Sequence, residues 1–380
     1  MSAPLAFVPG APWCPTAEQE RLLQACLLPA GPAPEPGAWL RQRHAAVPRD
    51  RQSRSLLPYV YLRQEALQPS GEALSLARAA YLEIWGDNQR RFQRLAEVLE
   101  RFAQAGIRGV LLKGAALATH YYSSEGLRDM GDVDVLVRPE DLGAAAGLLA
   151  ALGWTPGETL PGLKLAAQMR IRHAWGFYDP EGRSLDLHWR PFASCYSPEV
   201  AAELWQGVRS SRLRGAPVGV LDDTGQLFCV AVHAVQTGAN VRWIADSLAI
   251  LARGEVDWER LAGLARRSNL TVRLRAALDY LAARFAIAVP DSLAAGEAPE
   301  WERREARLQA EPFPWSPWKT LQWHWWTFRH RIRPHDAGWR RRPALLGFLG
   351  YWRLWLGYRP ARRAVSYVLR RRESSAMTHR

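Results

Sequence analysis

Apolar residues recur along this chain with two different periods, and each period predicts a different kind of element. Between Gly71 and Ala105 they return every three or four positions, which predicts one long helix that ends at Gly106. The stretch from Val110 to Val137 changes period. An apolar run enters Lys113-Gly114, a short helical piece follows, and acids then alternate with aliphatic residues. Alternation with a period of two predicts a strand with one polar face.

The same two periods continue on both sides of that stretch. Gly153 closes a predicted helix, and the turn 179–182 separates the arms of a predicted hairpin. The expected helices cover 16–28, 38–47, 56–67, 71–105, 115–122, 140–152, 226–236, 242–252, 258–267 and 272–286, and the expected strands lie near 110, 132–137, 170–178 and 183–189. The sequence therefore predicts an α/β fold of the α+β kind, with a small mixed sheet embedded in helices.

Composition divides the chain into five expected segments. These are an N-terminal helical region (1–105), a strand-containing core (106–222), a helical subdomain (223–289), a Pro/Glu/Arg-rich linker (290–317) and a Trp/Arg-rich amphipathic tail (318–380). The tail has two helical faces with apolar residues spaced by three and four: Trp318, Leu321, Trp325, Phe328 and Ile332, then Leu345, Phe348, Leu349, Trp352 and Leu356. At 380 residues the chain is long enough to bury a large core.

The formal net charge of +13 is concentrated at one end of the chain. Residues 319–380 contain 15 Lys/Arg and 2 Asp/Glu, which leaves 35 basic and 35 acidic residues in the remainder. The body is neutral, so the basic pI says little about a nucleic-acid partner for the whole protein. We expect the tail to contact the membrane surface or to dock on the body, and nucleic-acid binding is a weaker third alternative.

Cysteine spacing and apolar run lengths bear on the cellular compartment. Cys14, Cys26, Cys195 and Cys229 form no Cys-x-x-Cys pair, so the sequence suggests neither a zinc site nor a disulfide framework. The first fifteen residues lack the pattern of a signal peptide, and no apolar run reaches the roughly 18 residues of a spanning helix. We expect a cytoplasmic protein, with a peripheral position on the inner membrane surface as the alternative.

Two carboxylates in the alternating strand are the first candidates for chemistry. Asp132 and Asp134 are two positions apart, so they point to the same face. Carboxylates held side by side repel each other unless a divalent cation lies between them. Alternating aspartates can also simply line an exposed strand, and for an isolated Asp-x-Asp the two interpretations are about equal.

Four motifs together resemble one bacterial branch of the nucleotidyltransferase superfamily, the uncharacterised nucleotidyltransferase family 5. They are Leu112-Lys113-Gly114-Ala115-Ala116-Leu117, Gly126-Leu127-Arg128, Asp132-Val133-Asp134-Val135-Leu136-Val137 and Leu185-Asp186-Leu187-His188-Trp189. The resemblance covers roughly 72–264. It implies a mixed sheet of nucleotidyltransferase type and transfer of a nucleoside monophosphate from a nucleoside triphosphate, ATP being the first choice, with release of pyrophosphate.

The resemblance also implies roles for individual residues. Asp132, Asp134 and Asp186 would bind Mg²⁺ or Mn²⁺, and Asp186 would also act as the base. Lys113 and Gly114, with Ala115, would hold the triphosphate at a turn before a helix, although Lys113 could equally extend to solvent from a strand end. The superfamily usually has Gly-Ser or Gly-Gly where this chain has Gly114-Ala115, which removes a hydroxyl that could touch a phosphate.

Five further side chains are candidates whose roles the sequence leaves open. Arg128 would clamp phosphate or anchor its loop. His188 would touch the nucleotide or orient Asp186, and a structural histidine held by hydrogen bonds is an equal alternative. His233, Arg242 and Asp246 lie in the expected helical subdomain, where they would contact nucleotide or acceptor. For Asp246 the competing interpretation is a salt bridge with Arg242, four residues away on the same helix.

The acceptor is left open by the sequence. A small molecule or a peptide is expected, since no residue pattern distinguishes a sugar phosphate, an antibiotic-like molecule, a peptide natural product or a protein side chain. Two alternatives to an enzyme are a non-catalytic family member that binds nucleotide, and an adaptor that binds membrane or nucleic acid through 318–380.

Overall fold

A computed structural model describes residues 11–28, 51–157, 165–237, 241–290, 293, 298–311 and 316–358. Its centre is a seven-stranded mixed sheet in the order β3-β4-β5-β2-β1-β7-β6. The strands are β1 (Val110–Leu112), β2 (Asp132–Leu136), β3 (Thr155–Pro156), β4 (Ala174–Tyr178), β5 (Ser184–His188), β6 (Val208–Leu213) and β7 (Ala216–Leu221). The pairs β1–β7 and β2–β5 are parallel, and the other neighbours are antiparallel. The expected mixed α/β fold is confirmed.

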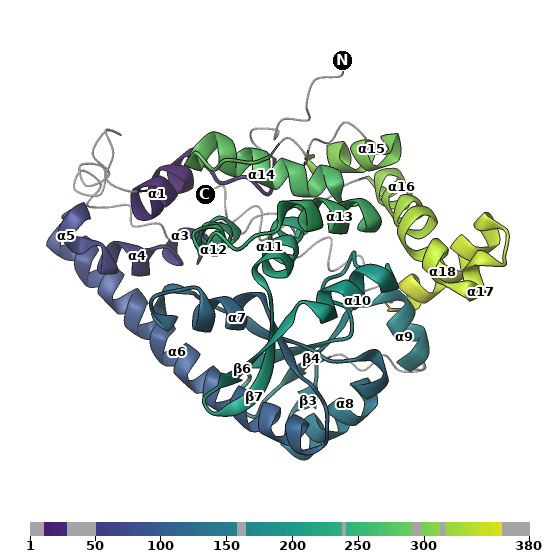
Figure 1. Cartoon of the computed structure of the whole chain (residues 1–380), viewed down its shortest axis with the longest axis horizontal. Helices are drawn as coiled ribbons and strands as arrows, with labels where there is room; N and C mark the ends of the chain where they lie inside the picture. Colours follow the sequence, from purple (N-terminus) through teal and green to yellow (C-terminus); the bar gives the residue numbers. More distant parts are fainter. Residues whose placement is uncertain are drawn as a thin grey trace.

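Helices surround this sheet, as Figure 1 shows. Before and within the sheet region lie α1 (Ala17–Leu27), α3 (Arg51–Arg54), α4 (Leu57–Leu62), α5 (Gln64–Leu67), α6 (Gly71–Gln104), α7 (Lys113–His120), α8 (Leu142–Ala151), α9 (Leu165–Ile171) and α10 (Pro198–Gln206). After it come α11 (Asp223–Thr237), α12 (Arg242–Leu251), α13 (Trp258–Ser268), α14 (Thr271–Phe285), α15 (Glu300–Gln309), α16 (Pro317–Trp326), α17 (Ala337–Arg340) and α18 (Ala344–Tyr358).

The long helix α6 flanks the sheet along one side. Ser70 caps it, because its hydroxyl accepts a hydrogen bond from the Ala73 backbone N–H at 3.3 Å. Gly106 follows its end with φ 73°, a left-handed conformation that glycine adopts without steric cost. One face of α6 packs in a core shared with α8 and the sheet, to which Phe92, Leu99 and Phe102 contribute fully buried side chains. The packed end of α6 thus fixes the position at which the chain enters β1.

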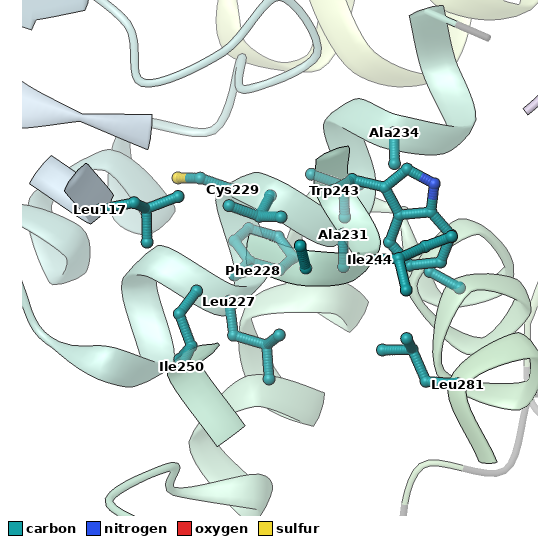
Figure 2. Close-up of a cluster of buried hydrophobic side chains, with 14 of the residues drawn as sticks. Leu117, Leu227, Phe228, Cys229, Ala231, Ala234, Trp243, Ile244, Ile250 and Leu281 are labelled. Atoms are coloured by element: carbon teal, nitrogen blue, oxygen red, sulfur yellow. The ribbon is translucent and has the colours of Figure 1, made fainter. Parts of the chain in front are cut away.

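A second core joins the helices that follow the sheet to α7. Figure 2 shows Leu117 of α7 near Phe228 and Cys229 of α11, with Trp243 and Ile244 of α12 in the same cluster. These side chains are almost completely buried. Because α7 begins at the end of β1, this core fixes the helical subdomain against the edge of the sheet at which α7 starts.

The tail docks partly on the body through ion pairs and aromatic packing. Fully buried Glu305 of α15 pairs with Arg331, at 2.5 and 2.6 Å, and with Arg273 of α14, at 3.0 Å. Arg170 of α9 pairs with Asp336 at 2.7 and 2.8 Å and lies 3.7 Å from the ring centre of Trp339. Phe328, Ile332, Trp339, Phe348 and Tyr351 form a small core between the tail helices.

Several local expectations differ from the structure. Arg170 and Ile171, expected in a strand, end α9, and the strand begins at Ala174. The helix expected from 226 begins at Asp223, and the segment 290–317, expected as a linker, includes α15 with buried Glu302 and Glu305. α10 and the β6–β7 hairpin were not expected, because their sequences lack a clear period. The expected helix at 38–47 lies outside the described residues.

The described helices were also compared with the length of a membrane span. None of them is both long and apolar enough to cross a bilayer.

Candidate active site

The pairing of β2 with β5 brings Asp134 and Asp186 together. The two strands are parallel and place these aspartates directly opposite each other. Neighbouring residues in register project to the same face, so both carboxylates stand on one side of the sheet. One ligand atom each from Asp134, Asp186 and His188 lie within 4.8 Å of one another. Two candidates that are 52 residues apart in sequence are therefore adjacent in space.

Asp132 lies two residues before Asp134 on the same face of β2. Its side chain is exposed, whereas Asp134 is only 7% exposed. Desolvation and then the negative charge of Asp134 raise the pKa of Asp132, and the same two causes raise the pKa of Asp186. The three carboxylates therefore repel one another, and a divalent cation between them would relieve that repulsion. The compact ligand group contains His188 in place of Asp132.

Lys113 and His188 both contact the same oxygen of Asp134. Lys113 Nζ lies 3.3 Å from Asp134 Oδ1, and His188 Nε2 lies 2.7 Å from the same oxygen. Burial opposes ionisation of Asp134, but the Lys113 charge and the His188 hydrogen bond outweigh it and lower the pKa of Asp134. Burial also opposes the Lys113 charge, and Asp134 and Asp132 outweigh it and raise the pKa of Lys113. Asp134 is thus held as a carboxylate and Lys113 as an ammonium.

The hydrogen bonds of His188 fix where its protons lie. Its Nδ1 is 3.0 Å from the Arg190 carbonyl oxygen, which can only accept, so Nδ1 donates. Nε2 lies 2.7 Å from Asp134 Oδ1. His188 is fully buried and sits between a backbone carbonyl and a carboxylate. That arrangement is typical of a histidine that orients or ligates beside a metal site.

The donor set fits a divalent cation. Asp134 and Asp186 supply the carboxylate oxygens that Mg²⁺ and Mn²⁺ prefer, and His188 supplies an imidazole nitrogen that Mn²⁺ also accepts. A bound cation would take over the neutralising role of Lys113. Asp132 is close enough to influence the charge of Asp134 and Asp186.

Two glycines of this region, Gly176 and Gly114, lie where a side chain would have little room. Gly176 of β4 is the register partner of Asp186, and a Cβ at that position would lie 3.2 Å from Asp186 Oδ1. A Cβ at Gly114 would lie 3.0 Å from Met130. Lys113 itself has φ 44°, a left-handed conformation that is uncommon for a residue with a side chain. The backbone at the start of α7 is therefore closely constrained, with Ala115 fully buried behind it.

Two more histidines lie around this group. The ring of His173 is 5.2 Å from that of His188, edge to face, and burial followed by the charges of His188 and Lys113 holds its pKa well below the usual value. Burial and the nearby Lys113 lower the pKa of His233 to about 3. His233 was expected near the site from its helix, whereas His173 was not singled out, because a single histidine before a strand has no distinguishing spacing.

Arg128, Arg242 and Asp246 lie beside the site but form different pairs from those expected. Asp246 pairs with Arg128, at 2.8 and 2.9 Å, and also accepts a 2.7 Å hydrogen bond from the Tyr122 hydroxyl. Arg242 instead donates to the Asp129 backbone oxygen at 2.6 Å and lies 3.2 Å from its carboxylate. The expected i, i+4 pair of Arg242 with Asp246 is wrong. Arg128 is 8% exposed and anchors its loop, which is the second of its two interpretations.

Comparison with known proteins gives one family. The family described as "Uncharacterised nucleotidyltransferase" matches residues 51–286. Among curated proteins, no sequence matches the chain. Two solved structures are similar to it: the antibiotic-resistance factor ANT(2'')-Ia (15% identity over 52% of this chain and 97% of that chain, TM-score 0.34) and an antigenic nucleotidyltransferase-like protein from Paracoccidioides brasiliensis (14% identity over 53% and 95%, TM-score 0.33).

Proposed function

Because the chain belongs to the uncharacterised nucleotidyltransferase family, we propose that it transfers a nucleoside monophosphate from a nucleoside triphosphate to an acceptor and releases pyrophosphate. The observation that carries this proposal is the adjacency of Asp134 and Asp186 on parallel strands. ATP is the first nucleotide to test, and Mg²⁺ or Mn²⁺ the metal. In such a site the metal neutralises triphosphate charge and helps the acceptor group to lose its proton.

Asp186 is the best-placed general base. Its pKa is raised by desolvation and by the charge of Asp134, and a base works best when its pKa approaches the working pH. It is also less buried than Asp134, so an acceptor can reach it. Asp134 is held ionised by Lys113 and His188, which suits a ligand and not a proton acceptor. The two aspartates would therefore have different roles.

Lys113 and the turn at Gly114 would hold the phosphates. The ammonium of Lys113 is already directed at the acidic group, and a triphosphate bound there would offer it a second anionic partner. Gly114 lets the backbone approach closely at the start of α7, where N–H groups without helical partners favour an anion. Ala115 has no hydroxyl, so only the backbone N–H groups and the Lys113 ammonium would contact the phosphates here.

A cavity beside the Arg128–Asp246 pair is our candidate for the acceptor pocket. A cavity of about 600 Å³ is lined by residues that include Tyr59, Tyr122, Leu127 and Leu248. Tyr122 lines this cavity and donates a hydrogen bond to Asp246, which pairs with Arg128 of the loop before β2. The volume and the aromatic lining suit a small molecule or a short peptide segment, and this cavity is our candidate for the acceptor.

The test is release of pyrophosphate. The protein is incubated with Mg²⁺ or Mn²⁺, each α-phosphate-labelled nucleoside triphosphate and a cell extract, and both pyrophosphate and label transfer are measured. Asp134→Asn and Asp186→Asn should each lower turnover by about a thousandfold or more, since each removes a charge at the reacting centre. The control is Asp141→Asn, whose side chain lies partly exposed at the start of α8.

The same experiment separates the enzyme from a non-catalytic family member. If the wild-type protein binds nucleoside triphosphate but yields no labelled product with any extract, the non-catalytic alternative holds. If product forms equally with Asp134→Asn, the reaction does not use this site and the assignment fails.

A further inference from the structure

The outer face of α18 exposes leucines that no described part of the chain covers. Leu345 is 64% exposed, Leu346 57% and Leu349 54%. Together with Trp318, at 72%, they are the four most exposed large apolar residues among the described ones. Burying a leucine is favourable, so several exposed on one helix indicate a surface that is covered by something else.

The two sides of α18 have opposite roles. At 100° per residue, Leu345, Leu349, Arg353 and Leu346 fall within one arc of about 100°. Phe348 and Tyr351 lie on the other side, where they pack against Phe328 in the tail core. The internal packing of α18 is therefore complete without the leucines, and their face is directed away from the core. Figure 1 shows α17 and α18 at the edge of the molecule, away from the sheet.

Positive charge surrounds these leucines. Arg340, Arg341 and Arg342 immediately precede α18, and all three are exposed, as is Arg353. None of the four has an acidic partner in the part of the chain that the structure describes. Arg333 donates to the backbone oxygens of Arg340 and Arg342, at 3.3 and 3.2 Å, which fixes the turn and adds a further cation. After α18, residues 359–380 contain seven arginines and one acid.

We propose that this face of α18 binds an anionic lipid surface. Leucines flanked by unpaired arginines match the interfacial zone of a membrane, where the apolar side chains enter the acyl boundary and the guanidinium groups meet phosphate. Two other occupants fit this face less well. A second copy of the chain would place two clusters of arginines against each other. An acidic groove of another protein would match the arginines but not the leucines between them. The contact is peripheral, because no described helix can span a bilayer.

Sedimentation with lipid vesicles tests this. The full-length protein should bind vesicles of phosphatidylglycerol mixed with phosphatidylcholine, and should bind phosphatidylcholine alone at least about tenfold more weakly. Leu345→Glu/Leu349→Glu should lower the partition coefficient about tenfold or more. The matched control is Leu76→Glu/Leu82→Glu, which changes two leucines on α6, 40% and 50% exposed, by the same charge. The control should stay within about twofold of the wild type.

The arginines are tested with a second pair of variants. Arg340→Gln/Arg341→Gln/Arg342→Gln should weaken binding and reduce its dependence on salt, because three charges near the lipid phosphates are lost. Arg78→Gln/Arg101→Gln/Arg266→Gln removes the same charge from exposed positions elsewhere and should have a smaller effect. Circular dichroism of all variants checks that the fold is retained.

Three outcomes would overturn the proposal. The first is no binding of the wild type to anionic vesicles, or equal binding by the two leucine pairs. The second is a change of mass of Leu345→Glu/Leu349→Glu in light scattering without lipid, which would assign the face to a second copy. The third is loss of binding to single-stranded RNA, but not to vesicles, in the same variant.

Discussion

The guanidinium of Arg128 and the carboxylate of Asp246 form two hydrogen bonds, Nε to Oδ1 at 2.8 Å and Nη2 to Oδ2 at 2.9 Å. The side chains are 10% and 4% exposed. Burial opposes the charge on Arg128, but Asp246 outweighs it and raises the pKa of Arg128. This pair joins the loop before β2 to α12, so the helical subdomain is held against the site by a buried ion pair.

Breaking that pair should destabilise the protein strongly. Asp246→Ala leaves a buried arginine without its partner, which costs roughly 3–5 kcal/mol in the free energy of unfolding. Asp87→Ala, which removes the exposed partner of Arg90, should cost less than about 1 kcal/mol. Urea unfolding of both variants measures the difference. Equal losses would show that the buried pair has no special role.

Substitution of Lys113 should separate metal binding from turnover. In Lys113→Met the ammonium 3.3 Å from Asp134 is lost. Mn²⁺ then no longer competes with an internal cation for Asp134, so it should bind more tightly in the absence of nucleotide. Turnover should nevertheless fall, by about a hundredfold, because a phosphate contact is lost. Mn²⁺ titration by paramagnetic resonance and the rate of pyrophosphate release test the two parts. Weaker Mn²⁺ binding would contradict this account of Lys113.

The space beside Asp186 should be needed for activity. Gly176→Ala places a methyl group 3.2 Å from Asp186 Oδ1 and forces the carboxylate to move by a few tenths of an ångström. We expect turnover to fall about tenfold with little change in melting temperature, since catalytic geometry is sensitive to small displacements. Gly143→Ala is the control, because a Cβ there meets open space. Unchanged turnover in Gly176→Ala would mean that the carboxylate has room to adjust.

Glu305 should hold the tail to the body. Glu305→Ala leaves Arg273 and Arg331 buried without their shared carboxylate, which costs roughly 3–5 kcal/mol or releases the tail. Glu300→Ala, on the same helix, removes a carboxylate that is 52% exposed and pairs only with partly exposed arginines, so it should lower the melting temperature much less. Limited proteolysis and thermal unfolding measure these effects. A protease-resistant tail together with an unchanged melting temperature in Glu305→Ala would refute this role.

Acid should destabilise the fold partly through His233. Its folded pKa is about 3, below the ordinary value of 6.5, so the unfolded chain takes up a proton first as the pH falls. Stability is therefore complete above about pH 6.5 and is lost as the pH falls towards 3. Between pH 7 and pH 5, His233→Gln should lose roughly 1–2 kcal/mol less stability than the wild type. Parallel losses in both proteins, measured by urea unfolding, would show that His233 does not contribute.

Patterns of neighbouring residues were sufficient to predict one long helix, the strand with the aspartates and the family. The period of 3.6 over 71–105 predicted α6 almost to the residue, because its apolar face is continuous and Gly106 marks its end. Alternation gave the strand that contains Asp132 and Asp134, and the motifs gave the family. Each of these features is encoded within a few neighbouring residues.

Which side chains meet was decided only by the tertiary structure. The partner of Asp246 is Arg128, 118 positions away, and the predicted partner four residues away binds Asp129 instead. Likewise, the β2–β5 register places His188, not Asp132, in the compact ligand group, and β4 brings His173 beside it. Long-range pairing follows from how elements pack against one another, and no local pattern carries that information.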